Sequence, residues 1–410
     1  MTLLSLADIH AAARRLDDVT VRTPLLPCPW AGDAARSLLL KPENLQVTGS
    51  FKLRGAYNRL ASLSAEERRR GVVAQSSGNH GKALAYAGRL LGVEVTVVVP
   101  GTAAQVKVDA IRHQGATVRE VPAAELATTT RMLAEEYGYV VVPPFDDLGI
   151  IAGQGTVGSE IFEQTARLGV VPDTVVVPVS GGGLISGVAA ALKQLLPGIR
   201  VVGVEPELAA DARESLHSGH RVSWPTRLTG RTIADGMRSS SVGTIPFAHI
   251  QEYVDDIVTV SEDEIRDTVA VLARESHIVV EPSGAVATAA YLHRGDDLPA
   301  GKLYVCVVSG GNIDSGGLPH AVHCRPPAAV LPEPARRTMA LEMRDRCERC
   351  ERPLLIEAPS ARICSYECTF CVSCSDAMQD TCPNCGGELV ARPRRTPSAT
   401  AEPTNGPPGR

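Results

Sequence analysis

The sequence has no excess of charge of either sign, and this excludes two broad classes of function. Its 410 residues carry 41 Lys and Arg against 46 Asp and Glu, a formal net charge of −5, and the pI is near 6.1. A surface of this kind has no general attraction for nucleic acid or for an anionic membrane. We therefore expect no nucleic acid and no membrane among its partners.

Uninterrupted apolar runs are also missing. The first eight residues place no basic region before an apolar core, so we expect no signal peptide and a cytoplasmic location. The longest uncharged run, residues 174–192, has the length of a membrane span. Because Pro178 and four glycines interrupt it, this run is typical of a strand, a turn and a helix instead.

Cysteine is scarce through most of the chain and concentrated near its end. Three cysteines lie in the first 346 residues, and the other eight fall between positions 347 and 385. The composition predicts four parts: a large globular region 1–322, a proline-containing linker 323–343, a cysteine-rich module 344–392 and a disordered tail 393–410. With 44% hydrophobic residues, the large region has enough apolar side chains for packed domains.

Short β-branched runs alternate with helical patterns in the large region. Buried strands are predicted at residues 72–74, 95–99, 140–142, 174–179, 201–204 and 303–308. Residues 82–91 predict a helix whose apolar face includes Leu90 and which ends at a left-handed Gly92 cap. Ser261 and Glu264 form a capping box that starts another helix. Strands spaced by helices indicate an α/β fold with mostly parallel sheets covered on both faces.

Three loops follow predicted strands, at the sheet edge where such folds collect their chemistry. The first, residues 76–81, opens a helix whose N-terminal N–H groups can hold an anion, although a simple helix cap gives the same pattern. The second, residues 180–187, carries three consecutive glycines that let backbone approach a phosphate. It lacks the Lys and Ser/Thr of a Walker loop, and a purely structural turn stays open. The third is residues 309–312.

Lys52 lies in a turn of small residues, with Phe51 beside it and no polar surface run nearby. Burial lowers the pKa of a lysine and leaves a neutral amine that can attack an aldehyde. The structural alternative is a buried Phe51 beside a lysine that extends its ammonium group to solvent.

Four motifs together resemble the pyridoxal-phosphate-dependent serine/threonine dehydratase family, over roughly residues 5–320. They are Thr48 to Tyr57, Ser76-Ser77-Gly78-Asn79-His80-Gly81, Ser180 to Gly187 and Ser309-Gly310-Gly311-Asn312. The resemblance implies pyridoxal phosphate as cofactor, a homodimer and the tryptophan synthase β-like fold (fold type II), with two doubly wound sheet domains. The small subdomain would span about 71–147, and the large one 1–70 and 148–322.

The resemblance also assigns roles to residues of this chain. Lys52 becomes the Schiff-base lysine and, with Ser77 on the opposite face of the cofactor, the catalytic pair. The implied cofactor-binding residues are Phe51, Lys52, Asn79, Gly181, Gly182, Gly183, Leu184 and Ser309. The implied substrate-binding residues are Ser76, Ser77, Asn79 and His80. A serine at position 309 cannot hold a ring-nitrogen cation as an aspartate does, and this favours elimination over transamination.

The implied reaction removes the α-proton and the β-hydroxyl of a hydroxy amino acid and yields a 2-oxo acid and ammonia. L-Threonine, and with it L-serine, is the expected substrate because Pro144-Phe145-Asp146-Asp147 is more like threonine dehydratases. Serine racemase and 3-hydroxyaspartate dehydratase remain alternatives. Biosynthetic threonine dehydratases, which serve isoleucine synthesis, usually end in a regulatory domain, and this chain has a different module there. A zinc-dependent interaction protein with an inactive dehydratase body is the alternative from another class.

Glu205 and Asp211 resemble the carboxylate pair of family members that bind a divalent cation, with the carbonyl of Ala209 as a third ligand. Oxygen ligands of this kind suit Mg²⁺ or Ca²⁺. The alternative is an exposed acidic helix start, where Asp211 interacts only with the helix dipole.

The eight late cysteines form four close pairs, the spacing that tetrahedral Zn²⁺ sites require. The pairs are Cys347 and Cys350, Cys364 and Cys368, Cys371 and Cys374, and Cys382 and Cys385. A cross-brace would join the first pair with the third and the second with the fourth; consecutive pairing is also open. Disulfides are the rival, but no signal sequence points to an oxidising compartment. The module resembles a small uncharacterised cysteine-rich bacterial family, and we expect a structural or protein-contact role for it.

Overall fold

The computed structural model divides the chain into two compact units, residues 1–326 and 327–410. It describes residues 2–32, 35–313, 345–354, 361–364, 368–384 and 386–391. The predicted linker 323–343, the predicted tail 393–410 and Cys385 lie outside these residues. Within the described part, no helix has the length and apolar character needed to cross a membrane.

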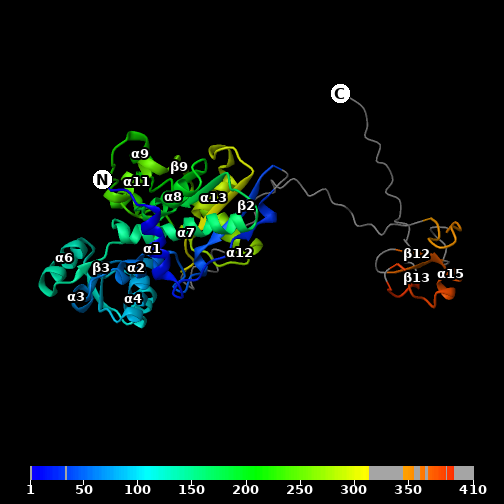
Figure 1. The fold of residues 1–410 in the computed structure, drawn as a ribbon, viewed down its shortest axis with the longest axis horizontal. Coiled ribbons are helices and arrows are strands. Elements are labelled where there is room, and N and C mark those ends of the chain that lie inside the picture. Colours follow the sequence, from blue (N-terminus) through cyan, green and yellow to red (C-terminus); the bar gives the residue numbers. More distant parts are fainter. Residues whose placement is uncertain are drawn as a thin grey trace, which may run out of the picture. The chain divides into compact units, whose positions relative to one another are not determined.

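A six-stranded sheet is the centre of the first unit (Figure 1). Its strands run in the order β1 (Leu26–Pro27), β2 (Ser37–Pro42), β10 (Leu303–Val308), β7 (Thr174–Pro178), β8 (Arg200–Pro206) and β9 (Asp256–Val260). Only β1 and β2 pair antiparallel, and all other neighbours are parallel. The sheet therefore directs most of its carboxyl ends to one edge.

Helices cover both faces of this sheet, because alternate strand residues point to opposite sides. On β10, Tyr304, Cys306 and Val308 pack toward α12 (Glu262–Glu275) and α13 (Pro282–His293). Val305 and Val307 of the same strand pack toward the other face. That face is covered by α7 (Leu148–Arg167), α8 (Gly183–Leu195) and α11 (Thr244–Tyr253). Both faces are thus buried, as a parallel sheet requires.

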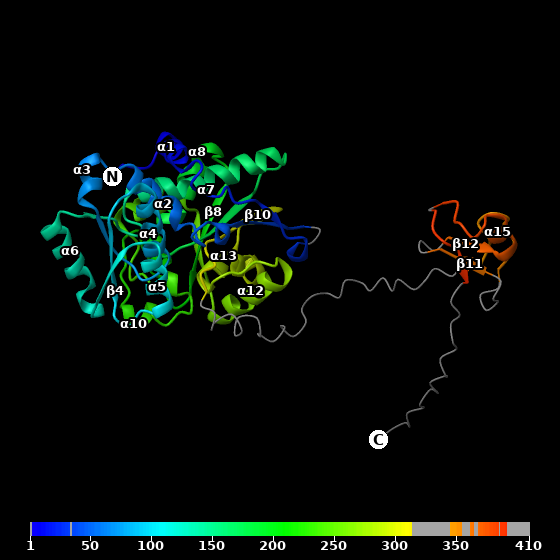
Figure 2. The ribbon, with the colours of Figure 1, turned by 90° about the horizontal axis from the view of Figure 1, so that it is seen from below.

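A second, all-parallel sheet has the strand order β5 (Thr117–Val121), β4 (Val95–Pro100), β3 (Val72–Gln75) and β6 (Val140–Val141). α4 (Asn79–Leu91) packs on β4, while α2 (Lys52–Ala61) and α5 (Gln105–His113) both pack on α4 (Figure 2). α6 (Leu126–Tyr137) packs on β3 and β4. Leu53 and Leu60 of α2 share one apolar core with this sheet. The residue after Lys52 is therefore part of that core.

The remaining helices complete the first unit. They are α1 (Leu6–Leu16), α3 (Ala65–Arg70), α9 (Asp211–Ser218) and α10 (Thr226–Thr229). Helix α7 joins the two sheets, because Ile150 at its start lies in the core of the small sheet and Val157 and Ile161 lie in that of the large one.

The sequence predicted six of the ten strands of this unit within two residues at either end, and the capping box of Ser261 and Glu264 is present at α12. Two details were wrong. Helix α4 begins at Asn79, three residues before the predicted start. Leu90 was expected on its buried face but is 48% exposed, while Leu84 is fully buried. Gly92 does end the helix in a left-handed conformation, with φ of 65°.

A network of buried ion pairs holds the first turn of α2 in place. Arg54 donates to both carboxylate oxygens of Glu43, at 2.7 and 2.8 Å, and to Glu160 at 2.6 Å. Lys41 donates to Glu160 at 2.6 Å. Two cations and two carboxylates cancel, so their burial is tolerated and the start of α2 is held in place.

The described residues of the second unit form a three-stranded antiparallel sheet and one short helix. The strands are β12 (Thr369–Cys371), β11 (Ala361–Ile363) and β13 (Val390–Ala391), in that order, and α15 (Val372–Ala377) follows β12 directly. Among the residues described in this unit, the core contains few apolar side chains, including Leu354, Phe370 and Leu389.

Candidate active site

A cavity of about 940 Å³ lies where the carboxyl ends of strands from both sheets meet. Gln75 and Pro100 line it from the small sheet, and Pro178 and Ser309 from the large one. All of the predicted cofactor- and substrate-binding residues line this one cavity: Phe51, Lys52, Ser76, Ser77, Asn79, His80, Gly181, Gly182, Gly183, Leu184 and Ser309. The structure thus brings the predicted set together, whereas the roles of its members stay predictions.

Lys52 is the first residue of α2, and its amine lies inside the cavity. Lys52 Nζ donates to the carbonyl oxygen of Pro144 at 2.8 Å. Burial lowers the pKa of Lys52 to about 8. A substantial share of this amine is therefore neutral in mildly alkaline solution, the state in which a lysine can attack a carbonyl or take up a proton.

Backbone pairing holds the Lys52 turn against the third loop. Ser50 and Gly310 form an isolated antiparallel bridge, and Phe51 N donates to the Ser309 carbonyl at 3.1 Å. The Ser309 hydroxyl donates to the Ser283 carbonyl at 3.3 Å. No carboxylate stands at position 309, so this position lacks the charge that would hold a protonated ring nitrogen.

The first loop ends in the N-terminal turn of α4, whose leading N–H groups have no partner within the helix. His80 lies in this turn, but its ring is 3% exposed and its Nε2 is 3.1 Å from the Val142 carbonyl. Burial, and then the Lys52 charge, lower the pKa of His80 to about 3. The neutral ring therefore supports the backbone, and what the turn offers an anion is its N–H groups.

The glycines of the second loop are required by close packing. A Cβ on Gly181 would lie 2.1 Å from the Phe145 ring, and one on Gly182 would lie 2.8 Å from Pro246. Gly182 also has φ of +88°, which side-chain-bearing residues rarely adopt. Neighbouring protein side chains therefore already require these glycines. This supports the alternative that the loop is a purely structural turn. The loop still precedes α8, whose N-terminus lines the cavity.

Three residues without a predicted role join the site. Glu281 is 5% exposed and accepts a hydrogen bond from Asn79 Nδ2 at 2.6 Å, and burial, with the Asp235 charge, raises the pKa of Glu281 to about 7. Asn312 contacts Asn79 and Lys82. The sequence signals were weak, because Glu281 before Pro282 has the pattern of an ordinary helix cap and Lys82 that of a solvated helix residue.

Glu205 and Asp211 are almost completely buried, at 0% and 1% exposure. Glu205 accepts from the backbone N–H groups of Ala212 and Arg213, at 3.1 and 2.8 Å. Within the described residues Asp211 Oδ2 has no hydrogen-bond partner. Burial, followed by the Asp211 charge, raises the pKa of Glu205, and burial raises that of Asp211 to about 7. Asp211 is therefore not part of an exposed acidic helix start, and its buried Oδ2 has no hydrogen-bond donor among the described residues.

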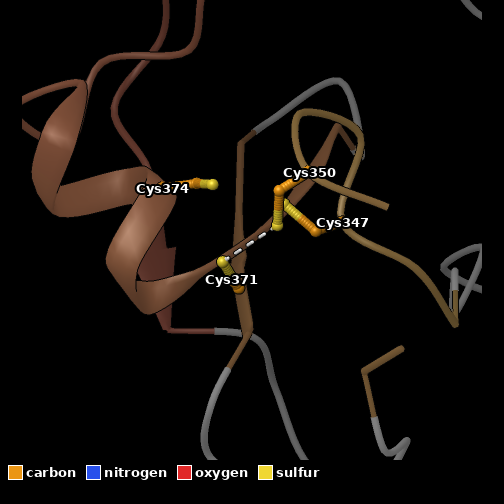
Figure 3. Close-up of side chains that lie close together, drawn as sticks. All are labelled: Cys347, Cys350, Cys371 and Cys374. Carbon is orange, nitrogen blue, oxygen red and sulfur yellow. Dashed lines mark hydrogen bonds between the residues drawn. The ribbon is translucent and has the colours of Figure 1, made fainter. Parts of the chain in front are cut away.

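The second unit gathers its cysteines into two clusters. Figure 3 shows Cys347, Cys350, Cys371 and Cys374 pointing toward one centre, with Cys374 on α15. Their sulfur atoms lie within 4.8 Å of one another. A second cluster contains Cys364, Cys368 and Cys382. The first pair thus joins the third and the second joins the fourth, the arrangement of a cross-brace; Cys385 lies outside the described residues.

Comparisons with known proteins match both units of the chain to families. Residues 16–310 match the family described as pyridoxal-phosphate dependent enzyme, and residues 340–395 match a protein family of unknown function (DUF1272). An L-threonine ammonia-lyase of Thermotoga maritima is 42% identical over 76% of this chain and 76% of its own. An L-threo-3-hydroxyaspartate ammonia-lyase of Saccharomyces cerevisiae is 38% identical over 77% of this chain and 95% of its own.

A solved structure is similar as well. The serine racemase of Dictyostelium discoideum has a TM-score of 0.70 and 40% identity, covering 76% of this chain and 99% of its own. The match in fold, together with the two parallel sheets and the loops at their carboxyl ends, confirms the predicted tryptophan synthase β-like fold. The chain therefore belongs to the pyridoxal-phosphate-dependent enzymes of the ammonia-lyase type, and it carries a DUF1272 module with clustered cysteines after that domain.

Proposed function

We propose that the protein is an ammonia-lyase that converts L-threonine, and L-serine with it, to a 2-oxo acid and ammonia. The observation that carries this proposal is the Lys52 amine, with its lowered pKa, in a cavity that also receives the N-terminal turns of α4 and α8. Two helix N-termini suit the two anionic groups involved, a cofactor phosphate and a substrate carboxylate. Pyridoxal phosphate, when bound, supplies the electron sink that makes the substrate α-proton acidic.

The chain's own residues divide the work in this proposal. Lys52 holds the cofactor and accepts the α-proton at Nζ. The N–H groups at the start of α4 orient the substrate carboxylate, and those of residues 181–184 bind the phosphate. Ser77 lies in the cavity wall and is the second base that a racemase would need. The homodimer implied by the resemblance stays a prediction.

The charges of the cavity favour threonine and serine over 3-hydroxyaspartate. A second substrate carboxylate needs a cation besides Lys52, and the lining offers Lys82, Lys107 and Arg238. Each already has a partner. Lys82 donates to Asn312, Lys107 pairs with Asp235, and Arg238 donates to the Thr232 carbonyl.

Steady-state assays with a panel of amino acids test the proposed function. We expect kcat/KM for L-threonine and L-serine to exceed that for L-threo-3-hydroxyaspartate by about tenfold or more, because Lys82, Lys107 or Arg238 would have to give up its present partner to bind the second carboxylate. The measurement scores 2-oxo acid against D-amino acid for each substrate. Turnover that yields mainly D-serine would favour the racemase, and no turnover of any hydroxy amino acid by cofactor-loaded protein would contradict lyase activity.

We also propose a divalent cation at Glu205, Asp211 and the Ala209 carbonyl, because the buried Asp211 Oδ2 has no donor within the described residues. Mg²⁺ or Ca²⁺ at about 100 times its Kd should stabilise the native protein by about 2.7 kcal/mol. Thermal unfolding with and without each ion measures this. Asp211→Asn should abolish the gain, whereas Glu207→Gln, which alters an exposed acid of the same segment, should preserve it. An equal gain in the Asp211→Asn protein would contradict the site.

For the second unit we propose Zn²⁺, bound by the clustered thiolates, as a structural cofactor. Four thiolates around one centre suit a soft divalent cation in tetrahedral geometry. A contact with another protein remains a second, separate prediction for this module.

A further inference from the structure

Three side-chain hydrogen bonds follow one another along the cavity wall. Lys82 Nζ donates to Asn312 Oδ1 at 2.8 Å, Asn312 Nδ2 donates to Asn79 Oδ1 at 2.7 Å, and Asn79 Nδ2 donates to Glu281 Oε1 at 2.6 Å. We call these four residues the Lys82–Glu281 chain. Every donor in it points the same way, from the ammonium group to the carboxylate.

The two groups that contact Asn312 besides Asn79 fix the orientation of its amide. Asn312 Oδ1 faces the Lys82 ammonium, which can only donate. Asn312 Nδ2 also faces the Thr48 carbonyl, which can only accept, at 2.9 Å. Turning the amide over would set donor against donor and acceptor against acceptor. Asn312 therefore presents an N–H group to Asn79.

The orientation of Asn79 follows from its two neighbours. Its Oδ1 receives the Asn312 N–H, and one of its own two N–H groups goes to the buried Glu281 carboxylate. The side chain lines the cavity. Asn79 Oδ1 and one of its N–H groups are already in hydrogen bonds, and its second N–H is the donor that it can offer to a ligand.

Two glycines make the room that these side chains occupy. A Cβ on Gly49 would lie 2.5 Å from Asn312 Oδ1, and Gly49 has φ of +77°. A Cβ on Gly310 would lie 2.3 Å from Glu281 Oε1. Gly49 precedes Ser50, and Ser50 pairs with Gly310 in the bridge next to Lys52. The backbone that positions Lys52 therefore also makes room for the Lys82–Glu281 chain.

We propose that Lys82, Asn312 and Glu281 are positioning residues that fix the orientation of the Asn79 amide, so that its second N–H is available as a donor in the cavity. A ligand oxygen at this point must then accept, and an ionised oxygen is favoured over a hydroxyl. This inference rests on the proposed function in one respect, since the ligand oxygen meant is the ring oxygen of pyridoxal phosphate. The chemical consequence is that the ring oxygen is kept in its ionised form.

Reversing the donor direction tests the inference. Lys82→Glu and Asn312→Asp each put an acceptor where the chain needs a donor, and Asn312→Asp does so with almost no change in shape. Lys82→Gln keeps a donor for Asn312 without the charge. Lys302→Gln removes a lysine charge at an exposed position of the same unit and is the control.

The readouts are the Kd of pyridoxal phosphate for apoprotein and the ratio of visible to near-ultraviolet absorption by bound cofactor, which follows ionisation of the ring oxygen. In both reversed variants we expect a lower ratio and about tenfold to a hundredfold weaker binding, the effect of losing one hydrogen bond to a charged oxygen. Lys82→Gln and Lys302→Gln should match the wild type.

Two results would overturn the inference. One is a wild-type ratio and Kd in both reversed variants. The other is Lys82→Gln behaving like Lys82→Glu, because charge and not donor direction would then matter. A wild-type protein that binds no cofactor at all would instead contradict the proposed function, so the two failures are distinguishable. Loss of binding in both reversed variants, with normal Lys82→Gln protein, supports the inference.

Discussion

Replacing Lys52 by alanine is expected to lower kcat for the ammonia-lyase reaction by about 10⁴-fold or more. The variant loses both the amine that holds the cofactor and the base that accepts the α-proton, and the base alone contributes about 10² to 10⁴. No other lysine can take its place, because Lys82 and Lys107, which also line the cavity, are engaged by Asn312 and Asp235. The measurement is 2-oxo acid formation under saturating substrate and cofactor.

The Lys52→Arg variant tests whether activity needs an amine that can lose its proton or only a positive charge. Arginine keeps a cation near the Pro144 carbonyl but stays protonated, so it can neither attack an aldehyde nor accept a proton. We expect the same loss of activity as in Lys52→Ala. Lys302→Ala, at an exposed position of the same unit, should retain full activity. A Lys52→Ala protein that keeps covalently bound cofactor or more than about a hundredth of the activity would contradict the assignment.

The sequence predicted the fold well where strands are buried on both faces. Strand β10 is one uninterrupted apolar run, and its predicted bounds match the structure. Four strands were not predicted, and one of them, β1, is only two residues long. β5 and β9 lie at sheet edges, where polar residues such as Glu120 and Thr259 interrupt the apolar pattern. β2 contains the buried Lys41, which is neutralised by Glu160, a partner 119 positions away that no local pattern reveals.

The candidate site was predictable in its loops but not in its side-chain network. Small residues at strand ends are a local pattern, and they marked the segments that line the cavity. Glu281 could not be found in that way, because its significance depends on Asn79, 202 positions away. The reason for the three glycines was also incomplete, since the close approach of Phe145 to Gly181 depends on the fold of residues 143–147.

Metal removal is expected to unfold the second unit and leave the first intact. Cysteines make up half of the module's buried core, and the other members are Leu354, Ala361, Phe370 and Leu389. So small an apolar core does not fold alone, whereas structural Zn²⁺ contributes about 10–16 kcal/mol in small zinc modules. A chelator added to reduced, full-length protein should therefore open residues 345–391 to proteolysis while lyase activity persists. Proteolytic resistance of that segment in metal-free protein would contradict a structural metal.

Two double variants of the full-length protein decide the ligand pairing. In the cross-brace, Cys347→Ser with Cys371→Ser removes two thiolates from one site and leaves the other complete (Figure 3). Cys347→Ser with Cys364→Ser removes one thiolate from each site and weakens both. Against a competing chelator, the first variant should retain one zinc ion per chain and the second none, while Cys28→Ser, a buried thiol of the first unit, should retain two. Consecutive pairing predicts the reverse order for the two double variants, because Cys347 and Cys364 would then share a site; elemental analysis of the three proteins distinguishes the arrangements.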